Sequence, residues 1–265
     1  MFKKIIKSIL SEFGLELVKV SFLERKTIVG ALGQIKKIWQ PDVVIDVGAA
    51  FGDWSKKCSY FFPEAHYLLV EPLDEYNKKL QVVLTELKHT SSFPVALSSE
   101  EGKKVFHVHD DLVGSSLKKE VEGGKTDGTE RTVPCTTLDK LTQDNNIKGN
   151  ILLKLDVQGA EVEVLLGASE TLKKAQCVIL EVSLFKSFVE GQDFYDIVHF
   201  MKERGFVVYD VAGFLYRPFD GALSQVDLVF VKEDGVFRKF HGYATPEQRA
   251  KQNEKFKESN KVLLK

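Results

Sequence analysis

Residues 42–56 read Asp-Val-Val-Ile-Asp-Val-Gly-Ala-Ala-Phe-Gly-Asp-Trp-Ser-Lys, and this stretch decides the fold. The run 43–47 is β-branched apart from Asp46, which predicts a strand buried on both faces. Gly48 and Gly52 predict a tight turn, and the residues after Gly52 predict a helix. Because a glycine turn at a helix start leaves backbone N–H groups beside open space, we expect this segment to hold the polar part of a nucleotide-like ligand.

A second apolar strand is expected at 66–70, directly before Glu71 and Pro72. Glu71 follows Asp46 by about two dozen residues, roughly where nucleotide-binding α/β units place the acid that accepts the ribose hydroxyls. The glycines stand as G-x-x-x-G rather than G-x-G-x-x-G, with an acid before them. This pattern favours S-adenosylmethionine (SAM), whose aminoacyl end needs backbone donors and a carboxylate, over a pyrophosphate cofactor.

The bulk composition fits one α/β domain, since the chain has 265 residues of which 43% are hydrophobic. We expect an N-terminal helical addition at 1–40, the main domain at 41–235 with an insertion at about 101–135, and a C-terminal helical tail at 236–265. The formal net charge of −1 argues against a nucleic-acid partner. The 3 cysteines are widely spaced, which favours neither a disulfide framework nor a metal site.

The sequence predicts no membrane-spanning helix. No stretch approaches the roughly 20 apolar residues that a spanning helix needs, and residues 2–13 lack the apolar core of a signal peptide, so we expect a cytoplasmic protein. Residues 2–13 form a basic amphipathic pattern that predicts a helix packed on the main domain. The alternative is a weak contact with a membrane surface or a second copy of the chain. A second helix is expected at 28–39, ending before Pro41.

Beyond the second strand, residues 92–98 predict a third strand that carries an early proline. Its end at Ala96 and Leu97 falls where an adenine would lie, because ligands of open α/β sheets bind outside the carboxyl ends of the strands. The regular alternation of elements then breaks at 101–135, which indicates an inserted β-hairpin.

The inserted segment carries two histidines. His107 and His109 share one face of an alternating stretch, and Asp110 and Asp111 follow. The two carboxylates are adjacent rather than spaced as ligands, so we predict no metal site. His109 is a candidate general base, and an ordinary surface hairpin is the structural alternative.

Residues 151–161 are the second informative stretch. A strand buried on both faces is expected to be apolar, yet Lys154 and Asp156 fall on one face of it. A buried ammonium needs a carboxylate partner, and Glu181 at the end of the strand 177–181 is the candidate. Ionisable groups gathered at the carboxyl edge of a sheet indicate an active site, although a plain buried ion pair is the structural alternative.

The last third of the chain predicts two more strands, at 206–211 and 227–231. The aromatic stretch 213–219 between them is expected to be a loop that borders the substrate cavity or packs under the sheet. A capping box then opens a charged helix at 249–264.

Eight motifs follow one another along the chain, at 46–52, 70–72, 95–97, 114–117, 137–139, 154–161, 165–168 and 227–230. In this order they resemble FkbM-like methyltransferases over residues 42–232. The resemblance implies an α/β, Rossmann-like class I SAM-dependent methyltransferase, with helices on both faces of a seven-stranded, mostly parallel sheet whose last strand is antiparallel. It also implies O-methylation, commonly of a sugar or polyketide-type hydroxyl, and therefore a small-molecule or glycan acceptor. Ala50 stands where many members have asparagine.

Methyl transfer to a hydroxyl needs a base as well as a cofactor site. Asp156 is the first candidate base, with Lys154 and Glu181 holding it, and His109 or His107 is the second. The predicted cofactor contacts lie at the expected strand ends, in the glycine turn and in the insertion. They are Asp46, Gly48, Ala49, Ala50, Phe51, Gly52, Trp54, Glu71, Pro72, Ala96, Leu97, Ser115, Asp156 and Val157.

Four other functions stay open at this point. They are N-methylation, methylation of a nucleic acid, cofactor binding without turnover, and nicotinamide-dependent oxidoreduction. The near-neutral charge disfavours the nucleic acid and the glycine spacing disfavours the nicotinamide. The acids at the strand ends argue against a protein that lacks turnover.

Overall fold

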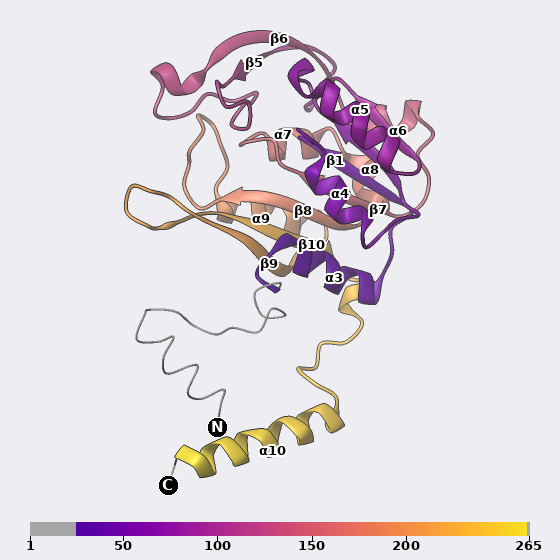
Figure 1. The fold of residues 1–265 in the computed structure, drawn as a ribbon, viewed down its shortest axis with the longest axis vertical. Helices are drawn as coiled ribbons and strands as arrows, with labels where there is room; N and C mark the ends of the chain where they lie inside the picture. Colours follow the sequence, from indigo (N-terminus) through magenta and orange to yellow (C-terminus); the bar gives the residue numbers. More distant parts are fainter. Residues whose placement is uncertain (1–24, 264–265) are drawn as a thin grey trace.

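The computed structural model describes residues 25–263, except the side chains of residues 125, 259 and 261–263. A seven-stranded sheet lies at its centre, with neighbouring strands parallel from β3 to β8 and with β10 antiparallel to both of its neighbours (Figure 1). In spatial order the strands are β3 (Thr90–Phe93), β2 (His66–Val70), β1 (Val43–Val47), β7 (Ile151–Leu155), β8 (Ala175–Ser183), β10 (Leu223–Lys232) and β9 (Phe206–Tyr216). The expected mostly parallel sheet with an antiparallel last strand is confirmed.

Strand order reverses between β1 and β7, because the chain builds the sheet outward from β1 to β3 and then outward from β7 to β8. In open α/β sheets, ligands bind outside the carboxyl ends of the strands at such a reversal. The carboxyl ends of β1 and β7 therefore mark the expected binding crevice.

Helices cover both faces of the sheet (Figure 1), as expected. Successive residues of a strand point to opposite faces, so Val44 and Leu152 pack in one core layer while Ile45 and Leu153 pack in the other. The first layer includes α3 (Ile28–Ile38), α4 (Asp53–Ser59) and α5 (Asn77–Glu86). The second layer includes α6 (Leu138–Asp144), α7 (Glu161–Leu166), α8 (Ser169–Lys174) and α9 (Phe194–Glu203).

The insertion forms a hairpin, as predicted, within a separate three-stranded sheet. In it β5 (Gly102–Val108) pairs antiparallel with β6 (Thr129–Thr136), which pairs parallel with β4 (Ala96–Leu97). The single third strand predicted at 92–98 is wrong. Pro94 has no N–H to donate, and the chain divides there into β3 of the main sheet and β4 of the small one.

The end of the main sheet also differs from expectation. The stretch 213–219 is not a loop up to Tyr216, because β9 continues to that residue and pairs with β10 at Leu223. The aromatic side chains therefore stand on a long hairpin that projects beyond the carboxyl edge of the sheet (Figure 1). Short 3₁₀ turns occur at η1 (Asp74–Tyr76), η2 (Gly124–Asp127) and η3 (Val236–Arg238).

The sequence predicts a helix near each end of the chain. The C-terminal helix α10 (Pro246–Leu263) begins with the predicted capping box, in which Thr245 and Gln248 exchange hydrogen bonds, and it lies apart from the main body (Figure 1). The helix expected at 2–13 lies outside the described residues. The division at residues 40 and 235 stays a prediction. No helix within residues 25–263 has the length and apolar character needed to cross a membrane.

Candidate active site

A pocket opens at the carboxyl ends of β1, β2 and β7, where the strand order reverses. It encloses about 650 Å³, counting its open mouth. Most of the predicted cofactor contacts line it, namely Gly48, Ala50, Glu71, Pro72, Ala96, Leu97, Ser115, Asp156 and Val157. Other predicted contacts lie outside this lining: Asp46, Ala49, Phe51, Gly52 and Trp54.

The turn after β1 gives the pocket its shape. Gly48 has a φ of 75°, and a Cβ added there would lie 1.9 Å from the backbone oxygen of Asp156. The N–H groups of Gly48 and Ala49 both donate to the carbonyl oxygen of Val70, at 2.9 and 3.1 Å. The turn thus brings β1 close to β7. Two further N–H groups of the turn, which were expected to be free, are also used inside the fold: that of Ala50 donates to Glu71, and that of Gly52 donates to the oxygen of Ala49.

Glu71 is fixed at one side of the pocket. Its carboxylate accepts the N–H of Ala50 at Oε2 and the N–H of Leu73 at Oε1, both at 2.9 Å. The residue is 6% exposed, and burial raises the pKa of this carboxyl to about 7. Two backbone donors hold the group in one orientation, and each oxygen keeps a second lone pair for a ligand.

Tyr76 is a pocket residue that the sequence analysis missed. It is 1% exposed, and its hydroxyl group has no hydrogen-bond partner among the described residues. Burial raises the pKa of this phenol to about 12. A buried donor without a partner is costly, so this hydroxyl is a group that a bound ligand would satisfy.

The Lys154 ammonium lies between two carboxylates. Its Nζ is 3.3 Å from Oδ1 of Asp46 and 3.2 Å from Oδ2 of Asp156. The expectation that Glu181 is the partner of Lys154 is wrong, because Asp46 is the cross-strand neighbour of Lys154 in the parallel register of β1 and β7. Burial lowers the pKa of Lys154, but Asp156 and Asp46 together raise it above its usual value.

Glu181 instead joins Asp156 through Gln158. The Gln158 side-chain amide donates to Asp156 Oδ1 at 2.8 Å and to Glu181 Oε2 at 2.9 Å. Gln225 donates to the same Glu181 oxygen at 3.2 Å. Gln158 has a φ of 51°, an uncommon conformation for a residue other than glycine.

Buried and half-buried carboxyl groups cluster beside this amide. Burial raises the pKa of Glu181 to about 8, that of Glu161 to about 7, and that of Asp227 to about 6. Asp227 lies opposite Glu181 in the antiparallel register of β10 and β8. Asp227 interrupts an otherwise apolar strand in the sequence, and this charge could have identified it as a candidate site residue.

The predicted base on the hairpin is not brought to Asp156. The Nδ1 atom of His109 lies 3.7 Å from a carboxylate oxygen of Glu120, and neither His109 nor His107 lines the pocket. Within residues 25–263, no set of three or more His, Cys, Asp or Glu side chains is arranged to hold a metal ion.

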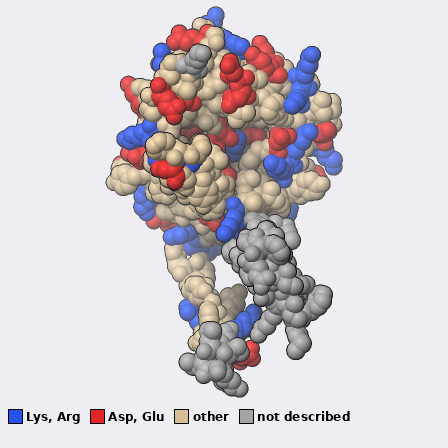
Figure 2. Space-filling view, turned by 60° about the vertical axis from the view of Figure 1, so that its left-hand side comes forward, with Lys and Arg blue, Asp and Glu red and all other residues tan. Residues whose placement is uncertain are grey.

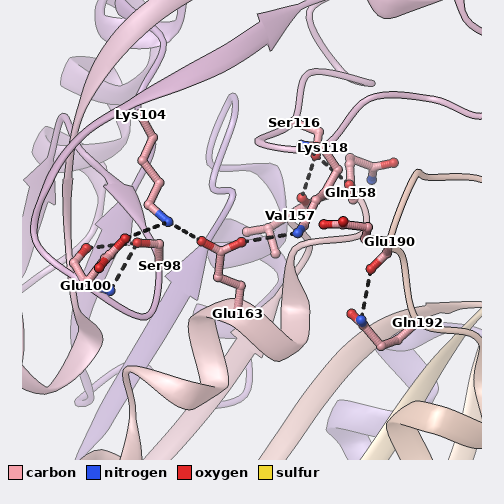
Figure 3. A network of polar contacts seen from close by, with 10 residues as sticks. All are labelled: Ser98, Glu100, Lys104, Ser116, Lys118, Val157, Gln158, Glu163, Glu190 and Gln192. Carbon is pink, nitrogen blue, oxygen red and sulfur yellow. Dashed lines mark hydrogen bonds and ion pairs between the residues drawn. The ribbon is translucent and has the colours of Figure 1, made fainter.

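The insertion is tied to the strand edge by a polar network (Figure 3). Glu163 of α7 lies between Lys104 of β5 and Lys118, and the Ser116 hydroxyl donates to the backbone oxygen of Gln158 at 2.6 Å. These contacts place the insertion as a wall beside the site. Basic and acidic side chains are intermixed on the face shown in Figure 2, without an extended patch of one sign.

Comparison with known proteins gives the family. A family model, the Methyltransferase FkbM domain, matches residues 46–208. The chain is 28% identical over 167 residues to 2-O-methyltransferase NoeI of Sinorhizobium fredii, covering 58% of this chain and 68% of that protein.

Solved structures with a similar fold include a methyltransferase FkbM from Methylobacillus flagellatus KT, at 14% identity and a TM-score of 0.45. The match covers 71% of this chain and 43% of that one, so the chain spans less than half of that structure's length. Another is magnesium protoporphyrin IX methyltransferase from Synechocystis PCC 6803, solved with bound SAM, at 14% identity and a TM-score of 0.44 over 77% of this chain and 76% of that one. On the family-model match, the chain belongs to the FkbM methyltransferase family.

Proposed function

We propose that this chain is a SAM-dependent methyltransferase that methylates a hydroxyl group of a sugar or glycan. The observation that carries the proposal is the pocket at the reversal of strand order, with a fixed carboxylate at Glu71 and a second carboxylate at Asp156. Membership of the FkbM family supports methyl transfer. The name of the Sinorhizobium relative, a 2-O-methyltransferase, supports a hydroxyl acceptor.

The residues of the pocket fit such a cofactor. Ala96, Leu97 and Phe106 supply an apolar wall suited to an adenine ring, while Glu71 supplies a carboxylate for ribose hydroxyls. Tyr76 supplies a buried hydroxyl without a partner among the described residues. When bound, SAM would supply a methyl group on a sulfonium, from which the neutral thioether S-adenosylhomocysteine leaves readily.

The protein's own contribution is to place the acceptor and to take its proton. Asp156 is the proposed base, since its carboxylate lines the pocket and lies beside Lys154 and Gln158, which fix its orientation. Glu181 acts through Gln158 and is a positioning residue. Such a base contributes roughly 10² to 10⁴-fold to the rate. His109 is the weaker alternative because it lies outside the lining.

Ligand binding by the full chain tests the cofactor. We expect S-adenosylhomocysteine to raise the thermal midpoint and to bind measurably by calorimetry, and NAD to do neither. A ligand at about 100 times its Kd stabilises a protein by about 2.7 kcal/mol, which such a scan detects.

A matched pair of variants locates the site. Glu71→Ala is expected to weaken S-adenosylhomocysteine binding by about tenfold or more, whereas Glu64→Ala changes an exposed glutamate and is expected to leave it unchanged. Stabilisation by NAD without stabilisation by S-adenosylhomocysteine would overturn the proposal. If both variants bind S-adenosylhomocysteine equally well, Glu71 is not part of the cofactor site.

A further inference from the structure

We propose that the hydroxyl group of Tyr76 recognises the adenine base of the cofactor by donating a hydrogen bond to one of its ring nitrogens. The proposal rests on the proposed function and names a residue that determines its cofactor specificity. Tyr76 lines the pocket, is 1% exposed, and its hydroxyl group has no hydrogen-bond partner among the described residues. Because buried tyrosine hydroxyls are usually hydrogen-bonded, this one is suited to a partner that a ligand supplies.

One turn after β2 holds both Glu71 and Tyr76. The N–H of Leu73 donates to Glu71 Oε1 at 2.9 Å, and the N–H of Tyr76 donates to the oxygen of Leu73 at 3.2 Å. Burial raises the pKa of Tyr76 to about 12, and the charge of Glu71 adds to this increase more than the charge of any other described residue. The phenol therefore lies close to the carboxylate proposed for the ribose, and the two groups act on neighbouring parts of one ligand.

The surroundings of Tyr76 indicate which part of the ligand it meets. Besides Glu71, the carboxyl groups whose charges act on its phenol are those of Asp111, in the insertion, and Glu75. Tyr76 also packs in the same core layer as Ala96 and Phe106, which belong to the apolar wall proposed for the adenine ring. The phenol is thus on the adenine side of Glu71.

An adenine ring in this pocket needs a donor. Its ring nitrogens N1, N3 and N7 accept hydrogen bonds, and a nitrogen that leaves water without a new donor carries a cost. Burial keeps the Tyr76 hydroxyl protonated at neutral pH, since its pKa is raised to about 12, so the group is available as a donor. The lining residues on this side otherwise have apolar side chains: Leu73, Ala96, Leu97, Phe106 and Leu112.

The phenol ring is held in place by its neighbours. Phe51 packs edge-on against Tyr76, with ring centres 4.6 Å apart and an angle of 90° between the rings. The Lys79 ammonium lies 3.9 Å from the centre of the Phe51 ring. A donor that is already ordered loses little rotamer entropy when a ligand binds, so its hydrogen bond contributes more to affinity.

A hydroxyl that serves a ligand predicts opposite effects on stability and on binding. Tyr76→Phe removes an unpartnered buried polar group, so it is expected to keep or raise the thermal midpoint of the ligand-free chain. The same variant is expected to raise the Kd of S-adenosylhomocysteine by roughly 5- to 20-fold. Tyr67→Phe is the matched control, because Tyr67 is also 1% exposed but its hydroxyl donates to the oxygen of Phe62 at 2.9 Å. It is expected to lower the midpoint and to leave the Kd within twofold of its original value.

Base analogues of S-adenosylhomocysteine identify the accepting atom. Calorimetry measures the Kd of the full chain and of Tyr76→Phe for S-adenosylhomocysteine and for its 1-deaza, 3-deaza and 7-deaza forms, each of which replaces one ring nitrogen by C–H. One deaza form is expected to bind the unmodified chain at least fivefold more weakly than S-adenosylhomocysteine, and Tyr76→Phe is expected to weaken that form no further. The 2′-deoxy form tests the ribose as the alternative partner, and with it Tyr76→Phe is expected to cause its full loss.

The outcomes separate this assignment from the proposed function. Failure of S-adenosylhomocysteine to bind the unmodified chain overturns both. A Kd for Tyr76→Phe within twofold of the unmodified value overturns the role of Tyr76 alone. A loss that persists with all the deaza forms, or that disappears with the 2′-deoxy form, overturns the assignment to adenine.

Discussion

Removal of the Lys154 ammonium is the sharpest test of the buried polar centre. In Lys154→Met, Asp46 keeps a carboxylate that is 0% exposed and loses the cation 3.3 Å away. Breaking a buried ion pair by removing one partner costs about 3–5 kcal/mol. In a chain of this size that corresponds to a fall of about 6–20 °C in the thermal midpoint.

The loss is expected to depend on pH, with a defined sign. Burial raises the pKa of Asp46, although Lys154 partly offsets this, so the variant's Asp46 has a pKa higher still. An acid whose pKa is raised by folding makes the folded state take up a proton. Stability is therefore lost as the pH rises from the unfolded pKa through the folded one. The deficit of Lys154→Met is expected to be smaller at pH 5 than at pH 8.

Urea denaturation at both pH values measures this deficit. The double variant Asp46→Asn with Lys154→Met removes both charges and is expected to recover much of the loss at pH 8. Lys140→Met is the matched control, since Lys140 is exposed and pairs with exposed Asp144, and it is expected to leave the midpoint unchanged. A loss below about 1 kcal/mol in the single variant, or no recovery in the double variant, would refute the reasoning, because a broken buried pair costs several times more.

Three further predictions address the turn, the acid cluster and the base. Gly48→Ala is expected to lower the thermal midpoint far more than Gly123→Ala. Both glycines have a positive φ, of 75° and 66°, so the backbone strain is similar. A Cβ at Gly48 would lie 1.9 Å from a backbone oxygen, whereas a Cβ at Gly123 would meet nothing within 4 Å. Equal shifts in scanning fluorimetry would contradict the steric reason. Glu181→Gln is expected to gain stability relative to the unmodified chain as the pH rises from 5 to 8. Burial raises the pKa of Glu181 to about 8, so its ionisation over this range destabilises the unmodified fold. A stability difference in urea denaturation that stays constant with pH would count against this. Asp156→Asn is expected to lower methyl transfer from SAM to a hydroxyl acceptor by roughly 10² to 10⁴-fold, and His109→Asn by no more than a few fold. The opposite order in a methyl-transfer assay would place the base on the hairpin.

The main sheet could be predicted from the sequence because its central strands are unambiguous. The runs 43–47 and 151–155 are short, apolar apart from Asp46 and Lys154, and bounded by turn residues, which is the pattern of strands buried on both faces. Once such a run is a strand, alternate side chains point to opposite faces, and this gives the two core layers. Where local pattern and long-range pairing agree in this way, sequence reasoning is at its strongest.

The errors arose where pairing partners decide the structure. Nothing local to residues 92–98 shows that Ala96 pairs with Cys135 of β6 rather than continuing the main sheet. Likewise, the strand character of 213–216 comes from its pairing with β10, across a register shift that no local pattern reveals. β-structure depends on such distant neighbours more than helices do.

The sequence pointed to several residues that line the pocket, but it did not show the contacts between them. Lys154 was recognised as a buried cation in need of a carboxylate, but its partner depends on the strand register, which places Asp46 beside it. Gln158 was missed because glutamine carries no charge signal, and its role comes from its positive φ and its two acceptors. Tyr76 was missed because an aromatic residue is ordinary in a core, and only the structure shows that its hydroxyl group has no partner among the described residues.

The distribution of perturbed carboxyl groups is itself an argument for function. Burial raises the pKa values of Glu71, Glu161, Glu181 and Asp227, and these residues all lie at the edge of the sheet where the pocket opens. Each raised pKa means that ionisation weakens the fold, and apolar residues of similar volume are often neutral or stabilising at such positions. A purely structural role predicts that replacing Glu181 by leucine would raise stability and change no binding. A recognition role predicts that the same change would stabilise the fold while weakening ligand binding at this edge of the sheet, so stability and binding would move in opposite directions.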